Sequence, residues 1–385
     1  MEMSFNFLAN PKLYFGKEKI FLLPKILREL GKNILLITTN SFTKSSIYTR
    51  LLEDFRKEKL KVSEFINYSE PSVENVDLIV KEFSKENINV VVSIGGGSPI
   101  DLGKAVSAML PLKESVATYL EGVGNKKHPG IKVPFIAVPT TAGTGAEATK
   151  NAVISKVGTN GFKRSLRNDN FMPDIAIVDP ELTKSCPLEV AFACGMDALT
   201  QLIESYVSTT SNVYTDALCE KAFSLFGYSF ERLLKNNADE NDLANLSFSA
   251  YISGITLTNA GLGAVHGFAS VIGGYYPLPH GVVCAKLLPF VTEQTIEKLK
   301  SQNENSLFLK KYLVIANLLT GKNKTDPTSL VEYLKNLNSK VRLKNFSEYG
   351  INFKEYEKIA SETSSKNNPI TLTKEDLIEI LEKSE

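Results

Sequence analysis

The sequence has no run of apolar residues that approaches the roughly 18 needed to span a bilayer. It begins Met-Glu-Met-Ser-Phe-Asn-Phe, without the basic and then apolar order of a signal peptide. Neither sign of charge is in excess, because 44 basic and 43 acidic side chains leave a formal net charge of +1. This balance does not indicate a nucleic acid or a membrane surface as a partner. Together these absences favour a cytoplasmic protein.

Cysteine is also scarce, and no two cysteines form a CxxC pair. A few unpaired thiols are typical of a reducing cytosol, and the four are Cys186, Cys194, Cys219 and Cys284. The rest of the composition is that of a globular enzyme, with 43% hydrophobic and 23% charged residues. A length of 385 residues exceeds one ordinary core and predicts two domains.

The first half of the chain alternates apolar runs with helical patterns. Short runs rich in β-forming residues predict strands at 34–38, 90–94, 133–138 and 175–178. Because these runs are apolar throughout, both faces of each strand are expected to be buried, which is typical of parallel sheets. Helical patterns such as 72–87 lie between them. The N-terminal half is therefore predicted to be a doubly wound α/β domain.

The second half is compatible with helices and has almost no β-branched runs. In 196–207, for example, apolar residues recur at helical spacing. The segment beyond about residue 300 is rich in Lys, Asn, Glu and Ser and is expected to form solvated helices. We place the domain boundary near 182–187, which predicts an α/β dinucleotide-binding domain at 1–184 and an all-helical domain at 185–385.

A glycine-rich turn follows the apolar run at 90–94. It reads Gly95-Gly96-Gly97-Ser98-Pro99-Ile100-Asp101. Ser98 is predicted to cap a helix that has Pro99 at its first position. Glycines allow close backbone approach and the free N–H groups of a helix start bind anions, so a dinucleotide pyrophosphate would fit. The turn lacks the GxGxxG fingerprint, and a tight turn that binds nothing is the alternative.

A second polar loop follows the run at 133–138. It reads Pro139-Thr140-Thr141-Ala142-Gly143-Thr144-Gly145-Ala146-Glu147. Its hydroxyl and backbone N–H groups would lie at the carboxyl edge of the parallel sheet, where ligands bind in such folds. A purely structural turn is again the alternative, but two such loops at one sheet edge favour a binding site.

The helical half holds a third group of candidate residues. Asp197 and Gln201 are four residues apart and share a helix face. His266 and His280 are two of only three histidines, and the glycines and prolines between them are expected to break the helix. A carboxylate and two imidazoles that converge would bind a divalent transition metal, although spacing alone favours histidines packed in the core. The third histidine, His128, is expected in a surface loop.

Five segments together resemble the iron-containing (group III) alcohol dehydrogenase family, and the resemblance covers nearly the whole chain. It implies an N-terminal nucleotide-binding α/β domain, a C-terminal all-helical domain, an active site in the cleft between them, and a homodimer. The implied activity is metal-dependent hydride transfer between NAD(P) and a primary alcohol or aldehyde. The segments are GGGSPIDLGK at 95–104, PTTAGTGAE at 139–147, PDIAIVDPELT at 173–183, GMDALTQLIESYVS at 195–208 and GAVHGFASVIGGYYPLPHGVVCAKLLP at 263–289.

The resemblance also implies roles for individual residues. Metal-ligand positions are held by Asp197, His266 and His280. Two positions depart from the family pattern: the fourth ligand, a histidine in relatives, is Gln201 here, and a further histidine of many relatives is Ser270. The positions that would hold the cofactor are Gly95, Gly96, Gly97, Ser98, Asp101, Thr140, Thr141 and Thr144.

The loss of one imidazole affects the chemistry rather than the fold. Three ligands still match the one-carboxylate, two-histidine count of catalytic sites, so metal is expected to bind, less tightly than in four-ligand relatives. Zn(II) becomes as suitable as Fe(II), whether or not Gln201 coordinates. A metal-independent NAD(P)H reductase, similar to maleylacetate reductases, and a non-catalytic nucleotide-binding protein are the alternatives. With Ser270, proton release must use the serine hydroxyl, the ribose or water.

Cofactor preference depends on the end of the strand at 34–38, where Thr39 and Ser41 are expected to contact the cofactor. No acidic residue in 38–44 would repel a 2′-phosphate, and Lys44 could meet one, which favours NADP over NAD. Four aromatic residues could line the cleft, which would favour a partly apolar substrate, or could equally pack in the core. A basic loop leaves an acidic substrate open. The aromatic residues are Tyr206, Phe268, Tyr275 and Tyr276, and the loop residues are Lys163 and Arg164.

Overall fold

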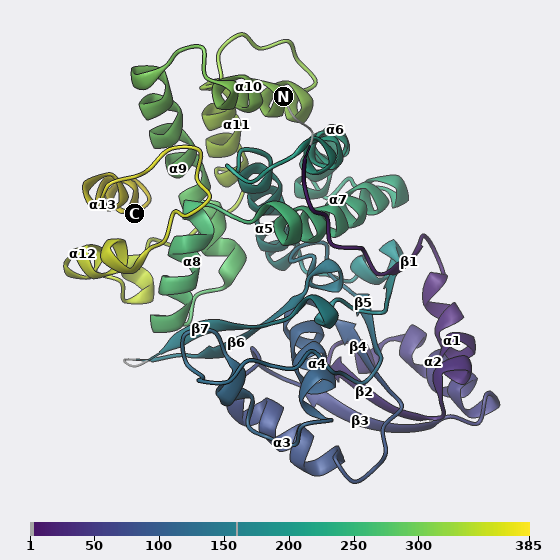
Figure 1. Ribbon diagram of the computed structural model, residues 1–385. Helices are drawn as coiled ribbons and strands as arrows, with labels where there is room; N and C mark the ends of the chain where they lie inside the picture. Colours follow the sequence, from purple (N-terminus) through teal and green to yellow (C-terminus); the bar gives the residue numbers. More distant parts are fainter. Residues whose placement is uncertain (1–3, 159–160) are drawn as a thin grey trace.

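The computed structural model describes residues 4–158 and 161–385, which form a parallel sheet flanked by helices and a separate helical layer (Figure 1). Two further strands form an antiparallel hairpin that reaches toward the helical layer. The strands of the sheet are β1 (Lys12–Phe15), β2 (Asn33–Thr39), β3 (Lys61–Asn67), β4 (Val90–Gly95), β5 (Phe135–Pro139) and β8 (Ile175–Val178), and the hairpin is β6 (Asn151–Lys156) with β7 (Phe162–Arg167).

The six strands pair in the order β1-β8-β5-β4-β2-β3, and every pairing is parallel. Strand β2 lies between β3 and β4, with Ile34 opposite Val90 and Thr38 opposite Ile94. The chain leaves β2 for β3 on one side and returns to β4 on the other. This reversal opens a crevice at the carboxyl ends of β2 and β4, the place where open α/β sheets bind ligands.

Helices cover both faces of the sheet. Leu35 and Ile37 of β2 pack in one core with α3 (Val73–Phe83) and α4 (Gly97–Met109). The alternate residues, Ile34 and Leu36, pack in the opposite core, with α1 (Leu23–Leu30) and α2 (Ser46–Lys57). Because side chains alternate across a strand, a strand covered on both faces is expected to be largely apolar. This holds for β2 and β4, in which Thr38 and Ser93 are the buried polar exceptions.

The four predicted strands are all present, but β1, β3 and the β6–β7 hairpin were not predicted. Strand β3 has the sequence KVSEFIN and lies at the sheet edge, so its side chains are mostly half-buried and its polar residues break the apolar run. The hairpin is equally polar, with sequences NAVISK and FKRSLR. Edge and hairpin strands therefore lack the continuous apolar signal that identified the central ones.

The second half of the chain is helical, and the predicted fold class is confirmed. Helix α5 lies at its centre, packed against α6, α7 and α9, and from Gly195 onward it is buried on all sides. The helices are α5 (Leu188–Tyr206), α6 (Val213–Leu234), α7 (Glu240–Ala260), α8 (Ala264–Tyr275), α9 (His280–Gln302), α10 (Leu307–Thr320), α11 (Ser329–Asn338), α12 (Phe353–Glu362) and α13 (Lys374–Lys383).

The helices beyond residue 300 are less solvated than expected. Each has a buried apolar face that joins the helical core, with fully buried residues such as Ile315, Leu334 and Ile380. Across the described ranges, no single helix is both long and apolar enough to cross a membrane. The pair α7 and α8 meets those criteria only jointly, and it is bent by 99°.

Candidate active site

A cleft of about 1330 Å³ separates the carboxyl edge of the sheet from the helical layer. The sheet side contributes the ends of β2 and β4 and the loop after β5, and the helical side contributes α5, α8 and α9. Most of the residues singled out in the sequence line this cleft, namely Thr39, Ser41, Gly96, Gly97, Ser98, Asp101, Thr141, Thr144, Asp197, Gln201, His266, Ser270 and His280.

Helix α4 starts two residues earlier than the glycine-rich turn predicted. Helix α4 begins at Gly97, and the N-cap is Gly96 in an extended conformation, so Ser98 and Pro99 lie inside the first turn rather than at its start. The prediction of a Ser98 cap was therefore wrong. The strand continues to Gly95, which leaves the capping position to a glycine with no side-chain cap. The free backbone N–H groups and the helix dipole at this end suit an anion.

The two polar loops touch one another. A Cβ atom on Gly97 would lie only 2.6 Å from Thr144 Cγ2, so a larger residue would force the loops apart. Thr141 and Thr144 face the cleft, whereas Gly95 and Thr140 do not line it. Instead, the Thr140 backbone N–H donates to the Gly95 carbonyl (2.9 Å) and extends the pairing of β4 with β5.

A buried lysine of α4, Lys104, bonds to the end of the second loop and to the segment that follows it. Lys104 Nζ lies 3.6 Å from Asp101 Oδ1. Burial lowers the pKa of Lys104 to about 8, partly offset by the two carboxylates nearby. Lys104 Nζ donates hydrogen bonds to the carbonyls of Ala146 and Asn151 and to the hydroxyl of Thr149, at 2.7–2.8 Å.

Glu147 lies behind the second loop and is also buried. Burial raises the pKa of Glu147 to about 7, and the charge of Asp101 adds to this, whereas the Glu147 backbone N–H and the Lys104 ammonium partly offset it. Asp101 itself accepts a hydrogen bond from the Val153 N–H at Oδ2 (3.0 Å) and faces the cleft.

On the helical side, one carboxylate, two imidazoles and one thiol converge. Asp197, His266, His280 and Cys284 each place a ligand atom within 4.8 Å of all the others. Asp197 Oδ1 lies 3.3 Å from His266 Nε2, 3.7 Å from His280 Nε2 and 3.9 Å from Cys284 Sγ. Carboxylate, imidazole and thiol groups at such spacing could hold a divalent transition metal.

His266 is oriented by a carboxylate that the sequence did not reveal. Its Nδ1 donates to Glu204 Oε2 (2.7 Å), and the other oxygen of Glu204 accepts the Val265 backbone N–H (2.6 Å). This bond directs Nε2 toward Asp197, the arrangement usual for metal-binding histidines. Burial opposes protonation, but the bonds to Asp197 and Glu204 raise the pKa of His266 to about 9.

His280 begins α9, and its imidazole is in the neutral form that binds metals. Burial lowers the pKa of His280 to about 4. Within the described ranges its Nδ1 has no hydrogen-bond partner although it is buried. The helix break before it lies at 276–279, whereas Gly273 and Gly274 remain inside α8. The fold thus brings His266 and His280 together as predicted, with ring centres 5.4 Å apart.

Gln201 uses both ends of its amide within the protein. Its Nε2 donates to Asp197 Oδ1 (3.0 Å), and its Oε1 accepts from the Ser253 hydroxyl (2.7 Å). Burial works to raise the pKa of Asp197, but His280, His266 and Gln201 outweigh it and lower that pKa. Gln201 thus stabilises the ionised form of Asp197.

Several residues lie elsewhere than predicted. His128 is buried rather than in a surface loop, with Nδ1 accepting from the Gly130 N–H (2.9 Å) and its ring against Tyr119 and Phe171. Two positions were left open for the four aromatic residues: none of them lines the cleft, and Tyr206 and Phe268 pack in the helical core.

The basic loop is in fact strand β7, and one of its residues reaches the cleft. Lys163 lines the cleft and pairs with Glu70 (3.1 Å), whose other partner is the Ser155 hydroxyl. A hairpin strand in which three of six residues are basic gave no apolar signal, which explains the loop assignment. Ser270 also faces the cleft, and its hydroxyl donates to the His266 carbonyl (2.9 Å).

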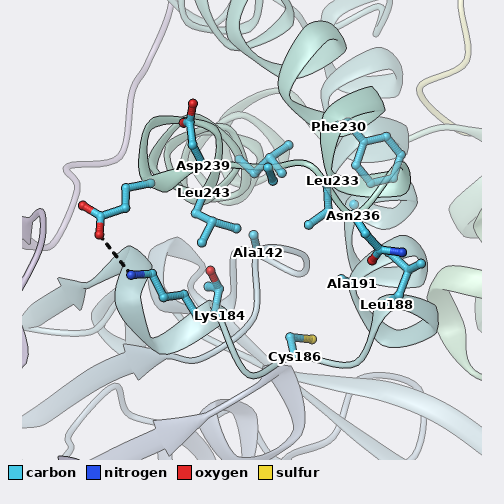
Figure 2. A pocket seen from close by; sticks show the side chains of 15 residues that line it. Ala142, Lys184, Cys186, Leu188, Ala191, Phe230, Leu233, Asn236, Asp239 and Leu243 are labelled. Atoms are coloured by element: carbon cyan, nitrogen blue, oxygen red, sulfur yellow. Dashed lines mark hydrogen bonds and ion pairs between the residues drawn. The ribbon is translucent and has the colours of Figure 1, made fainter.

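A second cavity, of about 520 Å³, lies between α5, α6, α7 and the segment that joins the two layers (Figure 2). Its walls are largely apolar, with Phe230, Leu233 and Leu243 facing inward, and Lys184 donates to Glu240 (3.1 Å) beside them. Burial raises the pKa of its thiol, Cys186, to about 11. The convergent donor groups are in the first cleft, which is the better candidate active site.

Comparison with known proteins agrees with this geometry. Residues 10–180 match the family model for iron-containing alcohol dehydrogenase, and residues 191–385 match the C-terminal model of the same family. Alcohol dehydrogenase 4 of Saccharomyces cerevisiae is 34% identical over 82% of this chain and 80% of its own. The NAD-dependent methanol dehydrogenase of Bacillus methanolicus is 32% identical over 74% of each chain.

Solved structures of an oxidoreductase and an alcohol dehydrogenase have the same fold as this chain. A 1,3-propanediol oxidoreductase superposes with a TM-score of 0.86 at 25% identity, covering 99% of this chain and all of the other. The alcohol dehydrogenase of Oenococcus oeni has the same TM-score, identity and coverage. The fold and cleft therefore define an oxidoreductase that acts on CH–OH groups. This chain belongs to the iron-containing alcohol dehydrogenase family.

Proposed function

We propose that this chain transfers hydride between a nicotinamide dinucleotide and a primary alcohol or aldehyde, assisted by a divalent metal held by Asp197, His266 and His280. The observation that carries this proposal is the convergence of two imidazole nitrogens on one buried carboxylate, in a cleft that also has an anion-binding sheet edge. The chemistry of the donor set supports the fit to a metal, since His266 Nε2 and His280 Nε2 lie 3.3 Å and 3.7 Å from the same oxygen of Asp197.

The sheet edge is the proposed cofactor site. The N–H groups of Gly96, Gly97 and Ser98 would meet the pyrophosphate, with the hydroxyls of Thr141 and Thr144 beside them. Gly95 and Thr140 would act through the backbone, since they shape the loops without lining the cleft. We assign the remaining contacts with the cofactor to Thr39, Ser41 and Asp101. We retain 1–184 and 185–385 as the two domains.

The bound metal would act as a Lewis acid and lower the pKa of the alcohol hydroxyl, as it does for water. The chain itself orients the groups around it. Glu204 fixes the tautomer of His266, and Gln201 keeps Asp197 ionised. Ser270 donates to the His266 carbonyl, so its oxygen retains a free lone pair toward the cleft for an outgoing proton.

NADP is the proposed cofactor, although relatives include both an NAD-dependent methanol dehydrogenase and an NADPH-dependent butanol dehydrogenase. In support, Thr39, Asn40 and Ser41 line the cleft at the end of β2, and none of them is acidic. Lys44 lies just beyond them, in an exposed turn. A specificity constant much higher for NAD would refute this preference.

The deciding experiment removes the metal from the protein with a chelator and follows NADPH and NADH oxidation anaerobically with a panel of small aldehydes. Activity that returns only with added Fe(II) or Zn(II) is the expected result. Activity without metal would favour a metal-independent reductase. Cofactor binding without turnover on any aldehyde would favour a non-catalytic nucleotide-binding protein. Homodimer formation and a cytoplasmic location are also proposed, the second supported by four free thiols.

A further inference from the structure

Cys284 lies on the metal-facing side of α9. It follows His280 by four residues, so the two side chains share one helix face. Its side chain is completely buried, and its Sγ lies 3.9 Å from Asp197 Oδ1, the oxygen that both imidazoles face. Cys284 does not line the cleft, so it approaches the ligand cluster from the protein interior while the cleft side stays open.

The spacing of the four groups fits a single ion. Zinc–nitrogen and zinc–oxygen bonds of about 2.0–2.1 Å and a zinc–sulfur bond of about 2.3 Å place tetrahedral ligand atoms about 3.3–3.6 Å apart. The observed separations from Asp197 Oδ1 are 3.3 Å to His266, 3.7 Å to His280 and 3.9 Å to Cys284. Small side-chain movements would therefore complete the coordination.

Gln201 is less suited to this role. Its oxygen accepts from Ser253, and the end that faces Asp197 is the NH₂ group, which donates a hydrogen bond and cannot coordinate a cation. Gln201 is therefore a positioning residue for Asp197 rather than a ligand.

We propose that the Cys284 thiolate is the fourth protein ligand of the metal and takes the place of the histidine that this chain lacks at position 201. The inference rests on the metal site of the proposed function. On binding, the S–H bond of Cys284 breaks, its proton passes to the solvent, and a sulfur–metal bond forms. A set of one thiolate, two imidazoles and one carboxylate prefers Zn(II) to Fe(II), because thiolate is the softer ligand.

The test replaces the metal of the full-length protein with Co(II), whose bond to a thiolate gives a charge-transfer absorption in the near ultraviolet. The wild-type protein is expected to bind one Co(II) and show this band. Cys284→Ala should lose the band and bind Co(II) at least about 10-fold more weakly. Gln201→Leu should keep the band. Cys219→Ala is the matched control, because Cys219 is equally buried but bonds to the Leu202 carbonyl outside the cluster.

The outcomes separate this inference from the function on which it rests. Co(II) binding by the wild-type protein without a charge-transfer band, or a band that persists in Cys284→Ala, would overturn the thiolate ligand and leave the metal site intact. A wild-type protein that binds no Co(II) would overturn both. Cys284→Ser preserves the shape of the side chain, so its loss of the band supports the proposal even if Cys284→Ala does not fold.

Discussion

The two sides of the cleft are built in different ways. On the sheet side, backbone N–H groups and small residues from β4–α4 and the loop after β5 face the cleft, so the loops themselves form the surface. On the helical side, polar side chains from α5, α8 and α9 converge, and they are up to 87 residues apart in sequence. The first surface depends on room for the backbone, and the second depends on particular functional groups.

This difference predicts two kinds of failure. A substitution among the helical donors removes an interaction that no neighbour can replace, so metal and chemistry should be lost together. A substitution at the sheet edge adds bulk to a loop, so cofactor affinity should fall while the metal stays bound.

The largest effect is expected for His280→Ala. Removing one of the imidazoles would weaken metal binding and lower turnover by about 10³-fold, since a Lewis acid supplies several kcal/mol of transition-state stabilisation. Metal content and kcat measured on the same preparation test this. His128→Gln, at the core histidine, should retain its metal. Full activity in His280→Ala would mean that the chemistry needs no metal.

The next effect is expected for Glu204→Gln. The carboxylate accepts one hydrogen bond at each oxygen, from the His266 Nδ1–H and from the Val265 N–H. An amide has only one oxygen that can accept, so one of these bonds is lost and the imidazole is no longer held in a fixed orientation. Metal affinity should fall about 10- to 100-fold, as measured by competition with a chelator. Glu220→Gln is the control, because Glu220 bonds to Tyr206 outside the cluster. Equal affinity in the two variants would refute the orienting role of Glu204.

A smaller effect, of a different kind, is expected for Gly97→Ala. The added Cβ would meet Thr144 Cγ2 at 2.6 Å and move the two loops apart. The Kd for the cofactor should rise about tenfold, corresponding to about 1.4 kcal/mol, while metal content stays unchanged. Adding Thr144→Ala should restore part of the affinity by removing the clash. Loss of metal in Gly97→Ala would show that the two sides of the cleft are not independent.

The same contrast explains what could be predicted from the sequence. Central strands and the loops after them form local patterns, so β2, β4, β5 and β8 and the two polar loops at the sheet edge were predictable from residue order. The edge strand β3 and the β6–β7 hairpin were not predicted, because half-buried strands carry polar residues that interrupt the apolar pattern. Lys163 was consequently assigned to a loop.

The helical cluster could not be derived from local pattern. Periodicity favoured histidines packed in the core, and only the family resemblance selected His266 and His280. The one histidine assigned to the surface, His128, is the one that packs in the core. Glu204 and Cys284 were missed because their roles depend on how α5, α8 and α9 cross, which no short stretch of sequence encodes.

The smallest effect on activity is expected for Glu147→Gln, which changes stability alone. The carboxyl group lies behind the sheet edge and does not line the cleft, and burial raises its pKa from 4.5 to about 7. Between these two pH values the unfolded chain releases the proton while the folded chain retains it. Ionisation therefore destabilises the wild-type protein progressively from about pH 4.5 to pH 7, by up to about 3 kcal/mol.

The neutral amide of Glu147→Gln does not ionise and so has no such cost. The unfolding free energy of the variant should therefore increase relative to that of the wild-type protein as the pH rises through this window. Urea denaturation of both proteins at several pH values from 5 to 7 measures the difference, and turnover at neutral pH should stay the same. Parallel stability curves would show that Glu147 ionises as easily in the folded chain as in the unfolded one. In that case the buried ammonium of Lys104, rather than a bound proton, neutralises it behind the cofactor edge.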